Sequence, residues 1–238
     1  MMSGRLCRRR SRRQILHTAA AILALVFFTH GARALQMSET GSADGEAILL
    51  LSGEVAMSDV DRILYALRSG RFSEVWLDSP GGDSAAGYKL GRAIRNGRLS
   101  TRVPKGAVCA SACVDIFLGG VVRFVDDRAT IMIHPGSISR SDTANEYMYS
   151  ALRQGKAVEA IQSLERFNSA ETSSWIEYLT FMGASLEIVT YAAKVQHDCA
   201  IVLSRQELVY FNILNTAGRP VSGYSPAEPN VRCNFGGQ

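Results

Sequence analysis

Short apolar runs alternate with amphipathic segments at least three times between residues 47 and 137. The strand-like runs are 47–55, 74–82 and 100–106, and the helix-like segments that follow them are 58–70, 83–97 and 110–120. Strands that alternate with helices form mostly parallel sheets with right-handed crossovers. The pattern therefore predicts an α/β fold with a mostly parallel sheet. Ser58 is expected to cap the first of these helices, and Asp83 or Ser84 the second.

The pattern changes on either side of this region. Residues 121–137 have the pattern of two short strands, and residues 141–195 have that of amphipathic helices. Residues 35–46 are small and polar, and the last residues, 216–238, are rich in Gly, Pro, Ser and Asn. We therefore expect a flexible leader over 35–46, a domain over 47–215 whose helical extension covers 141–195, and a tail over 216–238 that follows the surface.

The first 34 residues have the three parts of an export signal. They contain seven arginines and no acidic residue, then the apolar run 18–28, then the small-residue motif Ala32-Arg33-Ala34. This order is typical of a signal that is cleaved, so the mature chain is expected to begin near Leu35 in the periplasm or outside the cell. The arginine pair within 11–16 fits a twin-arginine signal, and a general secretory signal remains the alternative. The apolar run is too short for a stable membrane span after cleavage.

Net charge excludes a nucleic-acid partner once the signal is removed. The whole chain has a formal charge of +4, but removing the seven arginines of the signal leaves 19 of the 26 basic residues against 22 acidic residues. A mature chain with more acidic than basic residues lacks the electrostatic basis for binding phosphate backbones.

The cysteines fit an oxidising compartment. Cys7 leaves with the signal, and Cys109, Cys113, Cys199 and Cys233 remain. An even number in an exported chain indicates disulfides, and all three possible connectivities stay open. No pair has the C-x-x-C spacing of a metal site, and the mature chain has two histidines, at 134 and 197. We therefore expect no metal and no other cofactor.

Three loops of the predicted sheet carry groups suited to acyl chemistry. Ser79-Pro80-Gly81-Gly82 follows a strand, and its glycines allow backbone N–H groups to face an anion, although no G-K-[ST] follows as in a phosphate-binding loop. Ser111, within Cys-Ala-Ser-Ala-Cys, opens a helix, and the Ala112 N–H is a candidate oxyanion donor. His134 ends a strand before Pro135-Gly136 and is a candidate base. Taken singly, each fragment is better explained by structure alone: the first as a turn, the second as close helix packing and the third as a core or surface histidine.

Together, the three fragments resemble the proteolytic subunit of Clp protease and its relatives. Ser111 follows Gly82 by 29 positions and His134 follows Ser111 by 23, close to the spacing in that family. The resemblance covers roughly residues 47–137 and is closest to a periplasmic, signal-bearing subgroup with a similar Cys-Ala-Ser-Ala-Cys context. It implies a ClpP/crotonase-like spiral of ββα units with a helical C-terminal extension.

The resemblance implies a role for each matching residue. Ser111 would be the nucleophile and His134 its general base, with the N–H groups of Gly82 and Ala112 as the oxyanion hole. A hydroxyl needs such a base at neutral pH, and the developing charge needs fixed donors. The family's aspartate corresponds best to Asp198, although its spacing to the following Leu-Ser differs by two residues. Asp198 either orients His134 or caps a turn while a backbone carbonyl orients the imidazole.

The expected function is that of an exported serine peptidase acting on short or unfolded peptides, since no ATP-driven unfoldase works outside the cytoplasm. One alternative is a crotonase-like acyl-transfer enzyme, which an export signal disfavours because acyl-CoA is cytoplasmic. Another is a non-catalytic scaffold that keeps the fold and binds a partner. A serine–lysine mechanism has no matching motif among the four lysines of the mature chain. By analogy a homo-oligomer is expected, with residues 141–195 either at its contact surface or as a cap on the same subunit.

Overall fold

The structure is a computed structural model of the chain, and it describes residues 34–41, 45–136, 142–196, 198–216 and 223–233. From residue 34 onward, the described residues belong to one compact unit. The predicted signal at 1–33 and the histidine at 197 lie outside the described residues. None of the helices in the described ranges combines the length and apolar character needed to span a bilayer.

The larger sheet has five strands in the order β1-β2-β3-β4-β6. Their bounds are β1 Gln36–Gly41, β2 Ala47–Ser52, β3 Phe72–Asp78, β4 Ser100–Val103 and β6 Arg123–Val125. The pairs β2–β3, β3–β4 and β4–β6 are parallel, and the β1–β2 pair at the edge is antiparallel. The predicted α/β fold with a mostly parallel sheet is therefore confirmed in this part of the molecule.

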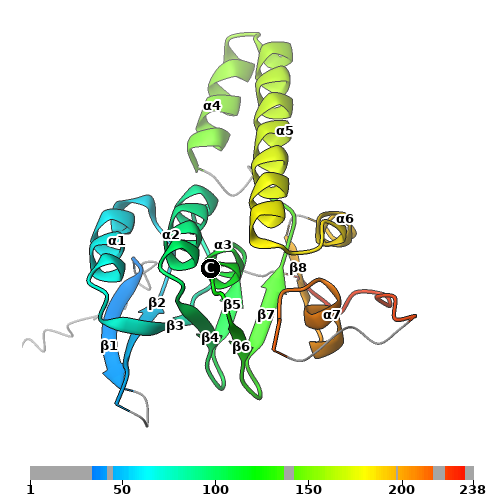
Figure 1. The fold of residues 1–238 in the computed structure, drawn as a ribbon. Helices are drawn as coiled ribbons and strands as arrows, with labels where there is room; N and C mark the ends of the chain where they lie inside the picture. The colour runs from blue at the N-terminus through cyan, green and yellow to red at the C-terminus, as the bar shows by residue number, and fades with distance from the viewer. Residues whose placement is uncertain (1–33, 42–44, 137–141, 197, 217–222, 234–238) are drawn as a thin grey trace, which may run out of the picture. The chain divides into compact units, whose positions relative to one another are not determined.

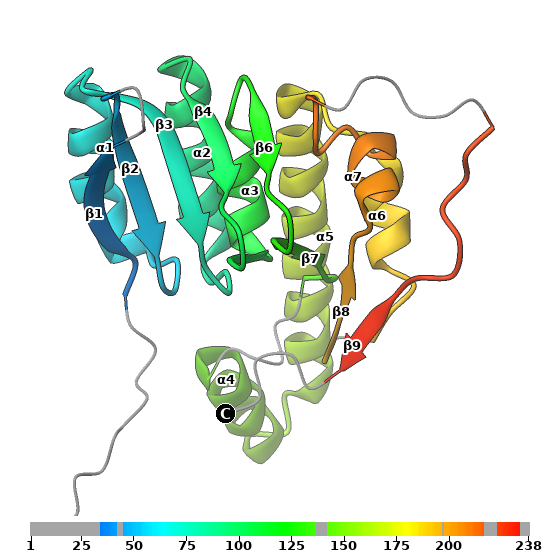
Figure 2. The same ribbon diagram turned by 90° about the horizontal axis from the view of Figure 1, so that it is seen from below.

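Three helices cover one face of this sheet (Figures 1 and 2). They are α1 Val60–Arg68, α2 Ser84–Asn96 and α3 Ala112–Leu118. The Asp83 side chain accepts a hydrogen bond from the Ala86 N–H at 2.8 Å and caps α2, as one of the two predicted caps. Ser58 does not cap α1, because a 3-10 turn, η1 Met57–Asp59, moves the helix start to Val60.

The smaller sheet has four strands in the order β5-β7-β8-β9. Its strands are β5 Val108–Ala110, β7 Thr130–Ile133, β8 Cys199–Val202 and β9 Val231–Cys233. The pair β5–β7 is parallel, whereas β7–β8 and β8–β9 are antiparallel. A parallel bridge between Ser79 and Cys109 connects β3 to β5, so the two sheets meet at the residues that follow β3.

The predicted helical extension is present. It consists of α4 Asp142–Arg153, α5 Ala157–Met182 and α6 Glu187–Ala192, and α7 Arg205–Tyr210 follows β8. Helix α4 lies beside α5 (Figure 1). The last turns of α5 pack into the core, since Tyr178, Leu179 and Met182 are fully or almost fully buried. Most of the preceding helix is exposed.

Residues 35–46 were expected to form a flexible leader, and this expectation is wrong for 36–41. These residues form β1, paired along its whole length with β2. Small polar residues suit this edge strand because its side chains are almost all exposed, and the backbone alone makes the sheet contact. Leu35, just before β1, anchors this strand to the domain, because its side chain is 1% exposed and packs in the main core.

The tail is fixed to the domain through β9. Cys233 lies opposite Cys199 in the β8–β9 register, and the two form a disulfide across a sequence separation of 34 residues. The second disulfide joins Cys109 to Cys113. The structure thus selects one of the three connectivities that the sequence left open.

Candidate active site

Ser111 and His134 lie at the same edge of the smaller sheet. Ser111 directly follows β5 and His134 directly follows β7, and these strands are parallel neighbours in which Ala110 pairs with Met132. The Ser111 N–H extends the pairing by donating to the Met132 carbonyl at 3.1 Å. The carboxyl ends of parallel strands are where α/β proteins place ligand-binding groups. The fold therefore brings the predicted nucleophile and the predicted base to adjacent positions.

The backbone of Ser111 has an unusual conformation. Its φ is 54° and its ψ is −128°, at the turn from β5 into α3. A residue other than glycine pays about 1–3 kcal/mol for such a conformation, which persists only where the surroundings impose it. Ser111 is half-buried, and its side chain makes no capping hydrogen bond with α3. The hydroxyl is thus presented by a strained strand-to-helix turn and is not used to stabilise the helix.

The Ser-Pro-Gly-Gly turn packs directly against Ser111. A Cβ added to Gly81 would stand 2.6 Å from the Ser111 Cβ and 3.1 Å from the Ala112 nitrogen. Gly81 itself has a φ of 100°, and its N–H donates to the Ser79 hydroxyl at 3.1 Å. Glycine is therefore required at position 81 both for its backbone conformation and for the close approach of the two turns.

Gly82 is held in place by the backbone of Val55. Its φ is 142°, and an added Cβ would lie 2.2 Å from the Val55 carbonyl oxygen. Hydrogen bonds from the Val55 N–H to Gly81 O at 2.7 Å and from the Asp83 N–H to Val55 O at 2.8 Å fix the turn. Within the described part of the chain, the N–H groups of Gly82 and Ala112 donate to no other protein group. Both predicted oxyanion donors therefore remain available beside the serine turn.

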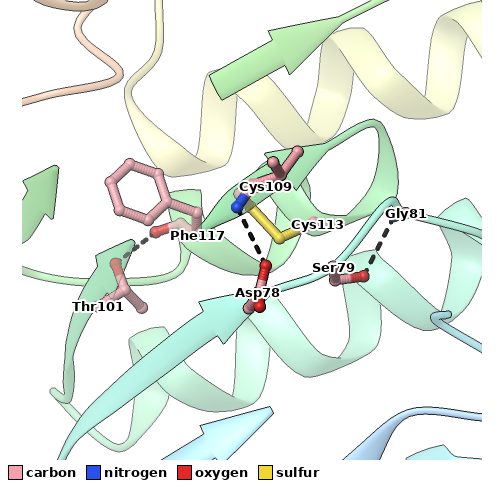
Figure 3. The surroundings of a disulfide bond; sticks show 8 residues. Asp78, Ser79, Gly81, Thr101, Cys109, Cys113 and Phe117 are labelled. Atoms are coloured by element: carbon pink, nitrogen blue, oxygen red, sulfur yellow. Dashed lines mark hydrogen bonds between the residues drawn. A yellow bond between two sulfur atoms is a disulfide. The ribbon is translucent and has the colours of Figure 1, made fainter. Parts of the chain in front are cut away.

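Figure 3 shows the Cys109–Cys113 disulfide, which closes a covalent loop of the chain that contains Ser111. Cys109 lies in β5 and Cys113 in the first turn of α3, with their Cα atoms 5.2 Å apart. Cys109 lies outside the helix, which begins only at Ala112. Both side chains are fully buried, so the disulfide lies beneath the turn and not at the surface that Ser111 reaches.

The His134 imidazole is bound to a backbone carbonyl. Its Nδ1 lies 2.7 Å from the carbonyl oxygen of Pro135, which can only accept a hydrogen bond. The contact therefore requires a proton on Nδ1, and in the neutral imidazole Nε2 is then the acceptor. A general base for a serine hydroxyl needs this tautomer. The geometry favours the alternative in which a backbone carbonyl orients the imidazole.

Asp198 lies just before β8, which is antiparallel to β7. The register pairs Ile133 with Ile201, so Asp198 belongs to the same edge as His134. Its side chain is exposed, and Oδ1 is 3.4 Å from the Cys199 Sγ. That sulfur belongs to a disulfide and has no hydrogen to donate, so the contact does not orient the carboxylate.

A buried carboxyl group one helical turn after Ser111 escaped the sequence analysis. Asp115 is 6% exposed, and burial raises its pKa well above the usual range. A hydrogen bond from Trp175 opposes this rise, and the charge of Glu171 adds to it. The signal was visible as a single acidic residue within the otherwise apolar Ala-Cys-Val-Asp-Ile-Phe-Leu. Asp115 joins α3 to α5, since the Tyr178 hydroxyl also donates to its backbone carbonyl at 2.5 Å.

The described residues contain no group of three or more His, Cys, Asp or Glu side chains able to hold a metal ion. The described groups near these strand ends are the Ser111 hydroxyl, the His134 imidazole, the Asp198 carboxylate and backbone N–H groups.

No family model matches the chain, and no curated protein matches it. Among solved structures, a point mutant of ClpP1 from Listeria monocytogenes is 20% identical with a TM-score of 0.45. ClpP1 from Listeria monocytogenes is 18% identical with a TM-score of 0.44. Each match covers 70% of this chain and 88% of the other. At these values no residue role is transferred from them.

Proposed function

We propose that this chain is an exported serine peptidase of the Clp-protease-like type that cleaves short or unfolded peptides. The observation that carries the proposal is the strained conformation of Ser111, at the strand end next to His134 and against the Gly81 turn. Strain of this kind in a residue with a free hydroxyl is typical of functional sites. The motif resemblance supports the same roles for the same residues.

In the first half-reaction, His134 Nε2 takes the proton of the Ser111 hydroxyl while Oγ attacks the peptide carbonyl carbon. The carbonyl oxygen becomes an oxyanion that accepts hydrogen bonds from the N–H groups of Gly82 and Ala112. His134 then returns the proton to the leaving amine as the C–N bond breaks, which leaves an ester on Ser111. The Pro135 carbonyl holds the imidazole in the required tautomer throughout.

In the second half-reaction, water attacks the ester carbonyl carbon. His134 takes a proton from the water, the same two amides stabilise the oxyanion, and the proton passes to Ser111 Oγ as the C–O bond breaks. The products are a free carboxylic acid and the regenerated hydroxyl. No group beyond this chain and water is consumed.

An oxidising compartment is part of the proposal. Two disulfides support it, one of them buried beside the proposed nucleophile, together with the predicted export signal. We further propose a homo-oligomer assembled through residues 142–196, because α4 and α5 carry exposed apolar side chains. These are Tyr147, Tyr149, Leu152, Val158, Ile161, Phe167, Ile176 and Phe181.

A fluorophosphonate probe tests the proposed function, because it reacts with an activated serine. Processed, folded protein should be labelled at Ser111, and labelling should vanish in Ser111→Ala. It should fall by about 10³-fold or more in His134→Ala, since the hydroxyl then lacks its base. Mass spectrometry of the labelled peptide identifies the site.

The other two functions predict different results. A non-catalytic scaffold or a crotonase-like enzyme would leave the folded, processed protein unlabelled. Labelling that persists in Ser111→Ala would place the reactive group elsewhere and contradict the assignment of Ser111.

A further inference from the structure

The residue that leads into β1 is held by two side chains from the start of α1. The Leu35 N–H donates to Asp59 Oδ2 at 3.1 Å, and the Leu35 carbonyl accepts from Arg62 Nη2 at 2.7 Å. Arg62 Nη2 also lies 3.1 Å from Asp59 Oδ1. Both backbone polar groups of Leu35 are therefore bound by one acid–base pair.

Leu35 is the only buried residue of the described segment 34–41. Ala34 is exposed, whereas the Leu35 side chain is 1% exposed and packs in the main core. Asp59 is 8% exposed, and although it occupies the N-cap position of α1, its side chain makes no capping bond. Its carboxylate is turned to the Leu35 nitrogen instead. A buried carboxylate facing one backbone nitrogen is well placed to bind a positive charge there.

The sequence gives a reason for a charge at that nitrogen. Ala32-Arg33-Ala34 is the predicted cleavage motif, so the bond cut would be Ala34–Leu35. Hydrolysis by water leaves a carboxylate on Ala34 and an amine on Leu35, which takes up a proton to become an ammonium group. Three N–H donors and a full charge then stand where one amide N–H stood.

We propose that Asp59 and Arg62 form a docking site for the mature N-terminus, in which the Leu35 α-ammonium pairs with the Asp59 carboxylate once Ala34–Leu35 is cut. The buried Leu35 side chain sets the register, because a cut one residue away would place the ammonium group out of reach of Asp59. Arg62 holds the Leu35 carbonyl and the second carboxylate oxygen, which fixes both partners. The inference rests on the predicted export signal and is independent of peptidase activity.

The docking site lies next to the segment that holds the Gly81–Gly82 turn in place. Asp59 closes η1, and the residue just before that turn, Ala56, accepts a hydrogen bond from the Asp59 N–H at 3.1 Å. Val55 immediately precedes Ala56 and carries the hydrogen bonds to Gly81 and Asp83. The docked N-terminus therefore stabilises the segment on which the Gly81–Gly82 turn rests.

The full-length precursor, expressed in an export-competent bacterial host, gives the first test. Intact-mass analysis of the exported protein should show a chain that begins at Leu35. A mature chain that begins at any other residue would overturn the proposal.

The second test is the reactivity of the α-amine of the exported protein toward an acylating reagent at pH 7. Pairing with Asp59 should slow acylation by about tenfold or more relative to Asp59→Asn, since one pKa unit changes the free-amine fraction tenfold. Asp61→Asn is the matched control, because Asp61 is an exposed acid in the same turn of α1, and it should react as the unaltered protein does. Equal rates in all three proteins would overturn the ion pair.

Unfolding the unaltered protein in urea gives a measurement that needs no variant. The amine should become at least about tenfold more reactive on unfolding, and an unchanged rate would overturn the proposal. The mass of the exported chain and the reactivity of its α-amine are both measured without the serine probe. They therefore test this inference even if Ser111 is never labelled.

Discussion

At the scale of single residues, the site depends on a backbone conformation that the sequence only hints at. The motif identifies Ser111, but its φ of 54° arises because β5, α3 and the Met132 carbonyl fix the chain on both sides. The contact of the His134 Nδ1 is local by contrast, since its acceptor belongs to the next residue. The family resemblance pointed to Asp198, whereas the Nδ1 contact is with the carbonyl of the adjacent Pro135.

Substitution of the two candidate acid–base residues should therefore have very different effects. Asp198→Asn should lower the rate of Ser111 labelling by less than about tenfold, since the Pro135 carbonyl still sets the tautomer of His134. His134→Ala should lower it by about 10³-fold or more. Second-order rate constants for the fluorophosphonate measure both.

The result for Asp198→Asn distinguishes an imidazole oriented by the Pro135 carbonyl from one oriented by the Asp198 carboxylate. A loss of more than about 10³-fold in Asp198→Asn, at unchanged Tm, would show that the carboxylate orients the imidazole in the reacting enzyme.

At the scale of elements, the sequence predicts most strands and helices of 47–137, because each has a clear period and a capping or glycine boundary. The three-residue strand β5 was not predicted. β1 was missed because an exposed edge strand has no apolar alternation, and its pairing with β2 is decided by contacts that the local sequence does not carry. The disulfide pairing was undecided for the same reason: β5 and α3 had to be placed before Cys109 and Cys113 became neighbours.

The Cys109–Cys113 disulfide should act as a clamp on the serine turn. Cys109→Ala with Cys113→Ala should slow Ser111 labelling by about ten- to hundredfold, because strain of about 1–3 kcal/mol is no longer opposed by a covalent link. Hydrogen exchange of peptides that cover the turn should also become faster, since the Ser111 N–H bond to Met132 would open more often.

The second disulfide provides the matched control. Cys199→Ala with Cys233→Ala also removes one covalent link but leaves the serine turn closed, so labelling should stay within about twofold while Tm falls. Equal losses of labelling in the two double variants would show that the Cys109–Cys113 link contributes only general stability.

The contact between α3 and α5 contains a group that titrates. Asp115 is buried between them, with Trp175 as hydrogen-bond donor and Glu171 nearby. Close packing here depends on small residues, since an added Cβ on Gly91 of α2 would lie 2.7 Å from the Asp115 carbonyl. The Tyr88 and Tyr178 rings stack beside it, with centroids 4.6 Å apart.

Stability should depend on pH through Asp115. Because burial raises its pKa in the folded protein, the folded chain keeps a proton that the unfolded chain releases at about pH 4. Stability is then highest below that pH and falls as pH rises through the folded pKa. Asp115→Asn should remove this loss, so its Tm advantage over the unaltered protein should grow between pH 5 and pH 8. Asp127→Asn, at an exposed position, should show no such growth.

At the scale of the whole molecule, most of the long helix α5 is exposed among the described residues. Val158, Ile161 and Phe167 on α5 are each more than half exposed, although the end of the same helix is buried. Apolar side chains gathered on one element in this way are typical of an interface between subunits.

The proposed homo-oligomer should therefore depend on α5. Val158→Glu with Phe167→Glu should shift the protein to the monomer mass in size-exclusion chromatography with light scattering, because burying two carboxylates in an apolar interface costs several kcal/mol. Tyr65→Glu is the control, since Tyr65 is 81% exposed on α1, away from the helical extension, and it should leave the mass unchanged. An unaltered protein that is already monomeric at micromolar concentration would contradict the oligomer, and the exposed residues of α5 would then belong to the surface of a single subunit.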